Sequence, residues 1–308
     1  MSNSFFDEDP QTGRVRHTAY SRELVTNKHL YDAVGFQIED VASAALKLPA
    51  VWKKYGQDVG EQERSAFSFS KGTDLSMYKY YSANPGLGRR FGSAMQFYTS
   101  DATWNLHHML GIFDWTSDEF DKPGALIVDV GGGHGQISHF LARNTKNVHF
   151  LVQDMEPVIE RAQKEVPEDI KDRIHLEVHD FFTPQSPVVS EKHAGPVTFF
   201  MRYISHNWSD GYFIQILNNL RPALQPGSKV LIMEFILDDF PNKDLTRRFG
   251  FQADMVMATL FNALERRAVD FEQLVKAADS RFKVNSIRTA PGSTMTSIVE
   301  VVWNGDSR

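Results

Sequence analysis

The chain has 308 residues, enough for one large or two modest domains with a sizeable core. Its 33 Lys and Arg against 39 Asp and Glu give a net charge of −6, so we expect no nucleic-acid partner. With 42% hydrophobic residues the chain is too apolar to be disordered, and its lack of cysteine excludes disulfides, thiol nucleophiles and cysteine-bound metals.

The first ten residues, MSNSFFDEDP, lack the basic start and apolar stretch of a secretory signal. Apolar runs such as 230–237 contain a charge and are far shorter than the ~20 residues that cross a bilayer. We therefore expect no membrane association and a cytoplasmic location.

Residues 1–100 place apolar side chains at helical spacing and predict a mainly helical accessory region. Helices are expected over 27–46, 48–55 and 74–84, and a short extended piece is expected over 14–20.

Residues 101–308 alternate short apolar runs with amphipathic segments, which predicts an α/β domain with a parallel sheet. The last two runs are separated by a Pro-Gly reversal and predict a terminal antiparallel hairpin. The seven strands are expected at 125–130, 148–153, 174–178, 197–202, 229–235, 282–288 and 297–303.

The first of these strands runs into a glycine-rich turn, LIVDVGGGHGQISHFLA. Glycines let a backbone turn tightly and approach a ligand. The spacing lacks the third glycine of a dinucleotide site and the Gly-Lys of a P-loop. G-x-G-x-G after Asp129 is instead typical of an S-adenosylmethionine (SAM) site, with Gly131 and Gly133 near the ligand and the acid engaging its ammonium group. A plain strand-to-helix turn is the alternative.

Two further strand ends suit a nucleoside. Asp154 follows Asp129 by about 25 residues, where a carboxylate can accept both ribose hydroxyls. Asp180 offers an acceptor for an adenine amino group, and Phe181 offers a ring to stack on it, although a Phe there is also an ordinary core residue.

The fourth strand leads into RYISHNWSD and places His206 at the carboxyl edge of the sheet, where ligands of parallel sheets bind. An imidazole there can take a proton at neutral pH and activate an oxygen nucleophile. Glu234 and Glu265 are candidates to orient it, and Glu234 is the stronger because Glu265 beside Arg266 and Arg267 also fits a solvated charge cluster. No metal-ligand cluster is expected.

In combination these motifs resemble the class I SAM-dependent O-methyltransferases of the plant caffeate and fungal secondary-metabolite type. The matching stretches are VDVGGGHG, the strand ending at Asp154, HDFF, SHNWSD, IMEFIL and MVMATLFNALERR. The resemblance implies a Rossmann-like seven-stranded methyltransferase sheet with a C-terminal antiparallel hairpin. It also implies SAM as cofactor and His206 as general base, supported by Glu234 and Glu265.

The resemblance also implies roles for single residues. Arg202 would contact SAM through its backbone. Four side chains that also fit a plain core would line the pocket of the aromatic acceptor: Phe91, Met95, Met255 and Phe261. Asn207, which stands where the family has Asp, would lie beside the acceptor as well.

The family normally carries a further winged-helix-like dimerisation segment, and residues 1–100 resemble its remnant. This implies a possible homodimer, weakened if that segment is missing, and poor order over residues 1–16. The expected activity is O-methylation of a phenolic or enolic hydroxyl of an aromatic, polyketide-like metabolite. A SAM-retaining pericyclase and a non-catalytic regulator are the alternatives.

Overall fold

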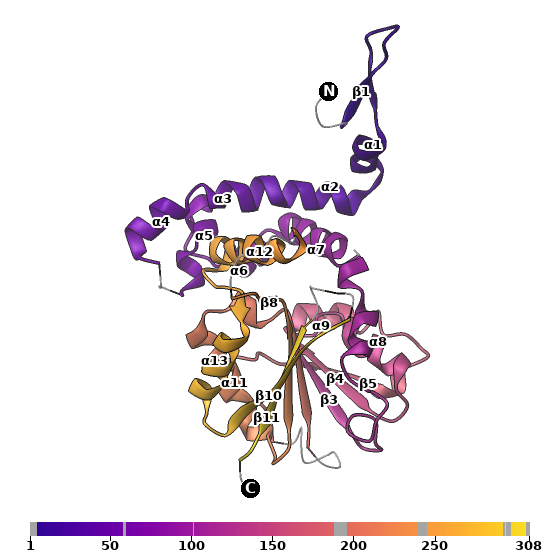
Figure 1. Cartoon of the computed structure of the whole chain (residues 1–308), viewed down its shortest axis with the longest axis vertical. Helices are drawn as coiled ribbons and strands as arrows, with labels where there is room; N and C mark the ends of the chain where they lie inside the picture. The colour runs from indigo at the N-terminus through magenta and orange to yellow at the C-terminus, as the bar shows by residue number, and fades with distance from the viewer. Residues whose placement is uncertain are drawn as a thin grey trace. The chain divides into compact units, whose positions relative to one another are not determined.

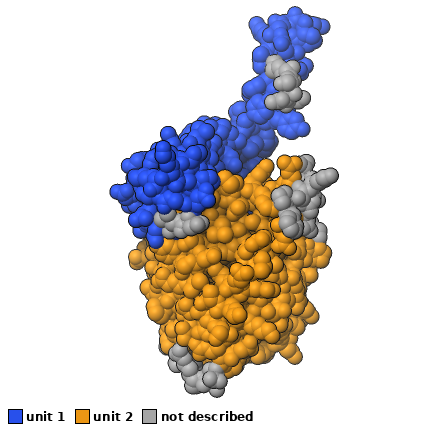
Figure 2. Space-filling model, turned by 60° about the vertical axis from the view of Figure 1, so that its left-hand side comes forward, with its two compact units in different colours: residues 1–105, 259–261 blue, residues 106–258, 262–308 orange. Residues whose placement is uncertain are grey.

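The computed structural model describes residues 5–57, 60–100, 102–187, 196–239, 245–291, 293 and 297–305. The chain divides into two compact units, one of residues 1–105 with 259–261, and the other of residues 106–258 and 262–308 (Figure 2). Among the described residues, no helix is long and apolar enough to cross a membrane.

The first unit is mainly helical, and its elements follow in chain order. They are β1 (Phe6–Glu8), β2 (Val15–His17), α1 (Ala19–Thr26), α2 (Lys28–Gly35), the π-helix η1 (Phe36–Ala42), α3 (Ser43–Ala45), α4 (Leu48–Tyr55), η2 (Gln62–Arg64), α5 (Ala66–Lys71), α6 (Met77–Ala83), α7 (Pro85–Thr99) and η3 (Ala102–Trp104).

The strands β1 and β2 form an antiparallel hairpin. The extended piece expected over 14–20 contains β2, whereas β1 and the pairing of the two strands were not predicted. Its turn is held by Asp9, whose carboxylate accepts from the backbone N–H groups of Gln11 and Thr12, and by Gly13 at φ +64°. The structure thus describes residues 5–16 as part of a hairpin, while residues 1–4 lie outside the described part of the chain, and the poor order of this segment stays a prediction.

The helix expected over 27–46 is one helical run, α2 to α3, interrupted by the π-helix η1. Within η1, Asp40 is 1% exposed, and its carboxylate lies 2.6 Å from Lys71 Nζ and 2.6 Å from Arg90 Nη2. A buried acid between two cations ties η1 to α5 and α7, helices that are distant in sequence.

Replacing Asp40 by Asn is expected to lower the free energy of unfolding by about 3 kcal/mol, because Lys71 loses its carboxylate partner and Arg90 loses the buried one of its two. Glu39→Gln is the matched control, since Glu39 also pairs with Arg90 but its side chain is 64% exposed. That variant should lose less than about 1 kcal/mol. Urea unfolding measures both, and equal losses would refute this account of Asp40.

The second unit contains the sheet and the helices that cover it. Its elements are η4 (Leu106–Gly111), β3 (Leu126–Val130), α8 (Gln136–Asn144), β4 (His149–Asp154), α9 (Glu156–Ala162), η5 (Lys171–Arg173), β5 (Ile174–Val178), β6 (Thr198–Arg202), η6 (Ser205–Asn207), α11 (Asp210–Leu220), η7 (Arg221–Ala223), β7 (Lys229–Glu234), β8 (Ile236–Leu237), most of α12 (Leu245–Phe261), β9 (Arg266–Arg267), α13 (Ala268–Ala278), β10 (Phe282–Thr289) and β11 (Ser297–Trp303).

The seven-stranded sheet has the order β10-β11-β7-β6-β3-β4-β5. Five neighbouring strands are parallel, and β11 is antiparallel to both β7 and β10. The fold class and all seven predicted strands are confirmed, each within one residue at either end. Half of the predicted Pro-Gly reversal over 289–296, residues 292 and 294–296, lies outside the described residues.

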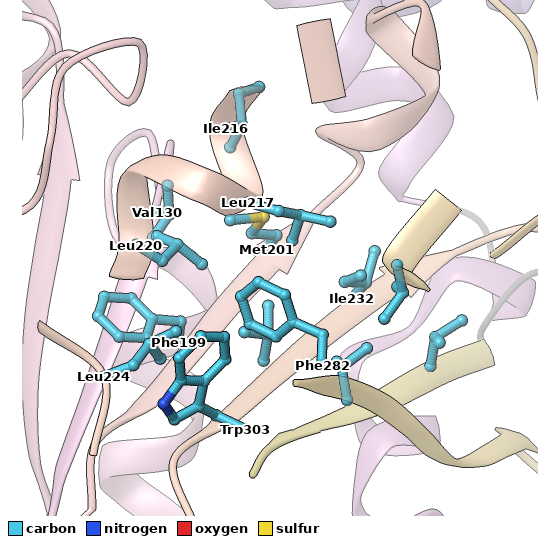
Figure 3. Close-up of a cluster of buried hydrophobic side chains, with 14 of the residues drawn as sticks. Val130, Phe199, Met201, Ile216, Leu217, Leu220, Leu224, Ile232, Phe282 and Trp303 are labelled. Carbon is cyan, nitrogen blue, oxygen red and sulfur yellow. The ribbon is translucent and has the colours of Figure 1, made fainter. Parts of the chain in front are cut away.

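Apolar side chains fill both faces of this sheet, because successive strand residues point to opposite sides. On β6, Phe199 and Met201 pack with α11 and α13 on one face (Figure 3), whereas Phe200 packs with α8 on the other. Figure 1 shows α11 and α13 on one side of the strands and α8 on the other. Because β3, β4, β6 and β7 are parallel, their carboxyl ends meet at one edge of this sheet, whose two faces are covered by helices.

Candidate functional site

The glycine-rich turn between β3 and α8 bends by left-handed backbone conformations. Gly131, Gly133 and Gly135 have φ of +66°, +59° and +78°, which side chains rarely adopt. A Cβ on Gly133 would meet nothing within 4 Å, so its backbone faces open space. Its N–H donates to Asp154 Oδ2 at 2.9 Å, which joins the turn to the end of β4.

Other parts of the turn are crowded. A Cβ on Gly131 would lie 2.7 Å from Ile204 Cδ1 and 3.5 Å from Phe181 Cε1. A Cβ on Gly132 would lie 2.6 Å from Asp129 Cγ. Both glycines therefore allow a close approach that no other residue type permits.

Asp129 packs against this turn and is 1% exposed. Burial raises the pKa of its carboxyl to about 6, although Ser138 Oγ donates to Oδ2 at 2.7 Å and opposes the shift. The structure thus shows Asp129 supporting the turn, and its contact with a ligand ammonium group stays a prediction.

Gly132→Ala is expected to destabilise the protein by about 1–3 kcal/mol, because its methyl group would overlap a buried carboxylate that Ser138 holds. Gly211→Ala in α11 is the control, since a Cβ there meets nothing within 4 Å and alanine favours a helix. Thermal unfolding should show a lower Tm for the first variant only. An unchanged Tm for Gly132→Ala would contradict the observed packing.

The remaining predicted cofactor residues lie at neighbouring strand ends. Besides the Gly133 bond, Asp154 Oδ1 accepts from the N–H of Met155 at 2.7 Å. Burial raises the pKa of Asp154, and these two backbone bonds oppose the shift. Asp180 is exposed, and Phe181 is partly buried with its ring against Trp208, centroids 5.9 Å apart. Arg202 ends β6 beside Met233 of β7.

His206 lies in η6, just beyond β6, and faces two buried carboxylates. Its Nδ1 is 2.9 Å from Glu265 Oε1 and 3.6 Å from Glu234 Oε2. Glu234 is 1% exposed, and its Oε1 accepts from the backbone N–H and the hydroxyl of Ser205 at 2.7 and 2.8 Å. An ionised carboxylate only accepts, so the bond to Glu265 places a proton on Nδ1.

This arrangement determines how His206 titrates. Burial disfavours the imidazolium, but the charges of Glu234 and Glu265 outweigh it and raise the pKa of His206 to about 9. In the neutral ring the proton stays on Nδ1, so Nε2 is the nitrogen with a free electron pair. The site can therefore accept a proton at Nε2 and keep the resulting cation next to two carboxylates.

A short parallel pairing brings Glu265 to this site. Ile236 of β8 pairs with Arg266 of β9. Glu234, two residues before Ile236, and Glu265, one residue before Arg266, therefore reach the same imidazole. Glu265 is 5% exposed and makes the direct 2.9 Å bond. The ranking of Glu234 above Glu265 was therefore wrong as far as geometry goes, and Glu265 is not part of a solvated charge cluster.

Arg266 is buried as well, at 1% exposure. Its guanidinium donates to the carbonyl oxygens of Ser205 and Trp208 and to Asp210 Oδ1, all at 2.7–3.0 Å. These bonds anchor the segment that carries His206. The roles of Arg266, Ser205 and Tyr203 at this site were not predicted from the sequence. The Tyr203 ring stacks on His206. The run of charged residues at 265–267 was the only hint of Arg266 in the sequence, but such a run does not show that the Arg266 side chain is buried.

Ligand atoms of His206, Glu234 and Glu265 lie within 4.8 Å of one another, a spacing that a metal ion could also bridge. Such a cluster was not expected from the sequence. A metal on Nδ1 would displace the proton that Glu265 accepts and would leave the neutral ring protonated at Nε2. The bonds that the structure shows fit proton acceptance at Nε2, and the absence of a metal from the reaction stays a prediction.

The five predicted acceptor residues are placed separately in the two units. In the first unit Phe91 and Phe261 both contact the Tyr78 ring, with centroids 6.3 and 5.3 Å apart, and Met95 is partly buried on α7. In the second, Met255 is 47% exposed on α12, and buried Asn207 donates from Nδ2 to the Tyr203 carbonyl oxygen at 2.9 Å. Their contact with an acceptor stays a prediction.

Two curated relatives cover almost all of this chain. It is 32% identical over 308 residues to the chlorophenol O-methyltransferase of Trichoderma longibrachiatum, covering 99% of this chain and 64% of that protein. It is 33% identical over 309 residues to the O-methyltransferase VdtC of Byssochlamys spectabilis, covering 98% of this chain and 68% of that protein. The chain thus spans about two thirds of the length of these relatives.

Two solved structures share the fold. OxaC in complex with sinefungin and meleagrin has a TM-score of 0.78 at 19% identity, covering 99% of this chain and 73% of that chain. A structure described as a pericyclic reaction enzyme has a TM-score of 0.77 at 19% identity, covering 98% and 74%. The O-methyltransferase domain family model matches residues 52–281, and with the 33% identity to VdtC this shows that the chain belongs to the O-methyltransferase domain family.

Proposed function

We propose that the protein transfers a methyl group from SAM to a phenolic or enolic hydroxyl of an aromatic secondary metabolite, with His206 as the general base. The observation that carries this proposal is the part-buried bond between His206 Nδ1 and Glu265 Oε1 at 2.9 Å, which in the neutral ring leaves Nε2 free to accept a proton. The family and the two relatives named as O-methyltransferases support the reaction class.

The residues at the glycine-rich turn fit SAM. Gly133 faces open space, the Asp154 carboxylate lies against it, and Asp180 is exposed next to the partly buried Phe181 ring. These groups suit the ribose hydroxyls and the adenine of a nucleoside. Asp129, Gly131 and Arg202 complete the set that we expect to hold it.

SAM supplies a methyl group on a positively charged sulfur, which passes to the acceptor oxygen as the sulfur becomes a neutral thioether. His206 takes the hydroxyl proton of the acceptor on Nε2. Glu265 keeps Nδ1 protonated and, with Glu234, stabilises the imidazolium that forms. The methyl donor is already activated, so the protein chiefly has to align the reacting atoms and remove one proton.

A chlorinated phenol appears in the name of one relative, and this supports a phenolic acceptor. We expect the acceptor to contact Phe91, Met95, Asn207, Met255 and Phe261. A homodimer and the descent of residues 1–100 from a dimerisation domain also stay predictions.

A SAM-retaining pericyclase is the second candidate, because the fold is shared with a pericyclic reaction enzyme. That likeness, at 19% identity, supports the fold alone. A pericyclic reaction has no need of a base, whereas this site holds an imidazole against two buried carboxylates. A regulator without activity would have no use for that arrangement either, so methyl transfer is the better supported function.

The test is an incubation with methyl-labelled SAM and a panel of phenols and aromatic polyketides, alongside calorimetric titration of SAM. We expect SAM to bind and label to appear on an acceptor oxygen. Conversion of a substrate without transfer of label would favour the pericyclase. Tight SAM binding without any chemistry across the panel would favour the regulator.

A further inference from the structure

Tyr203 joins β6 to η6 and has an unusual backbone. Its φ is +53°, a conformation that is unfavourable for a bulky residue, so the surrounding structure must impose it. The Tyr203 N–H donates to the carbonyl oxygen of Met233 at 3.0 Å, and its own carbonyl oxygen accepts from Asn207 Nδ2 at 2.9 Å. Both peptide groups of the residue are thereby held.

The strained backbone directs the Tyr203 ring onto the imidazole. The rings of Tyr203 and His206 are stacked, with centroids 5.7 Å apart and planes inclined by 27°. The Arg202 guanidinium carbon lies 4.8 Å from the centroid of the same Tyr203 ring, so the phenol ring is itself held by a cation–π contact. Burial raises the pKa of the phenol well above its ordinary value, so the ring stays neutral beside the base.

The bond from Nδ1 to Glu265 constrains one atom of the imidazole, while the side-chain torsions still allow the ring plane to tilt. A ring stacked on its face restricts this tilt and so sets the direction of the Nε2 electron pair. We propose that Tyr203 is a positioning residue that holds the plane of the His206 ring, and that its left-handed backbone is retained because it places the phenol ring on the imidazole. The predicted effect of Tyr203 on the rate of methyl transfer rests on the proposed function, whereas its predicted effect on the orientation of the His206 ring does not.

The experiment compares Tyr203→Phe, which keeps the ring, with Tyr203→Gly, which removes it and relieves the backbone. Asn262→Gly is the control for placing a glycine at a left-handed position, because Asn262 also has a positive φ, +54°. Tyr203→Asn is a second ring-free variant, since Asn tolerates this conformation.

The first readout is independent of turnover. In protein labelled with ¹⁵N-histidine, the His206 signals are assigned by their loss in His206→Gln. Above the His206 pKa of about 9, where the ring is neutral, we expect a predominant Nδ1–H tautomer in wild type, Tyr203→Phe and Asn262→Gly. In the two ring-free variants we expect a mixture of tautomers or a shifted titration midpoint. A wild-type His206 spectrum in both ring-free variants would overturn the proposal.

The second readout is kcat with methyl-labelled SAM and an acceptor from the panel. The ring-free variants should lose about tenfold or more in kcat with little change in the KM for SAM, because misorientation affects the reacting geometry. The kcat of Tyr203→Phe should stay within about threefold of the wild-type value. If this variant loses as much kcat as the ring-free variants, the hydroxyl and not the ring is responsible, and the proposal is overturned. If wild type itself transfers no methyl group, the proposed function fails and the NMR comparison alone decides the role of Tyr203.

Discussion

Replacing His206 by Gln should slow methyl transfer by about 10²–10⁴-fold, the range that a general base contributes. Gln is similar in size but cannot take up a proton. The glycine-rich turn and Asp154 are bonded independently of His206, so the Kd for SAM should stay within a few-fold of wild type. Single-turnover transfer of labelled methyl and calorimetric binding of SAM measure the two effects.

His175→Gln is the matched control, because His175 is exposed on β5 and its ring pairs with His149 rather than with a carboxylate. It should transfer methyl at the wild-type rate. A His206→Gln protein that keeps more than about a tenth of the wild-type rate would show that the acceptor loses its proton without this base.

Glu265→Gln should be almost as damaging, at about 10²–10⁴-fold in kcat, because an amide can donate to Nδ1 and stabilise the wrong tautomer. Glu234→Gln should cost less, since Glu234 lies 3.6 Å from Nδ1 and is held by Ser205. Glu272→Gln, at an exposed position of α13, is the neutral control. Steady-state rates for the three variants test this order, and a larger loss in Glu234→Gln would reverse the roles of the two carboxylates.

The pH profile gives these variants a second signature. Only the neutral imidazole accepts a proton, so kcat/KM of the wild type should rise with pH and level off above the His206 pKa of about 9. Removing the Glu265 charge lowers that pKa, so the rising limb should move to lower pH in Glu265→Gln. Ionisation of the acceptor affects both proteins alike when the same substrate is used. An unchanged midpoint would mean that the titrating group is not His206.

The same residues explain how much of this protein could be predicted from its sequence. The sheet and the glycine-rich turn were predicted correctly because their signals are local. Short runs of five to eight residues mark the seven strands of the sheet, and G-x-G-x-G follows directly after β3. The parallel topology then placed Asp154, His206 and Glu234 at one edge, since carboxyl ends of parallel strands meet there.

The hairpin of β1 and β2 and the π-helix η1 were not predicted, because both depend on specific contacts. The hairpin turn needs the Asp9 side-chain bonds, and η1 contains an acid that pairs with cations of two other helices. Hydrophobic spacing reports neither kind of contact.

The sequence by itself therefore determined the α/β class, the strand order along the chain and the residue types at the sheet edge. Only the tertiary structure decided which carboxylate binds the imidazole. Glu265 is 59 residues from His206 in sequence, and it arrives through a two-residue strand pairing and the burial of Arg266. Likewise, the stack of Tyr203 on His206 depends on a backbone angle that neighbouring strands and side chains impose. Such contacts join distant segments, and their free energy is gained only when the whole unit is folded.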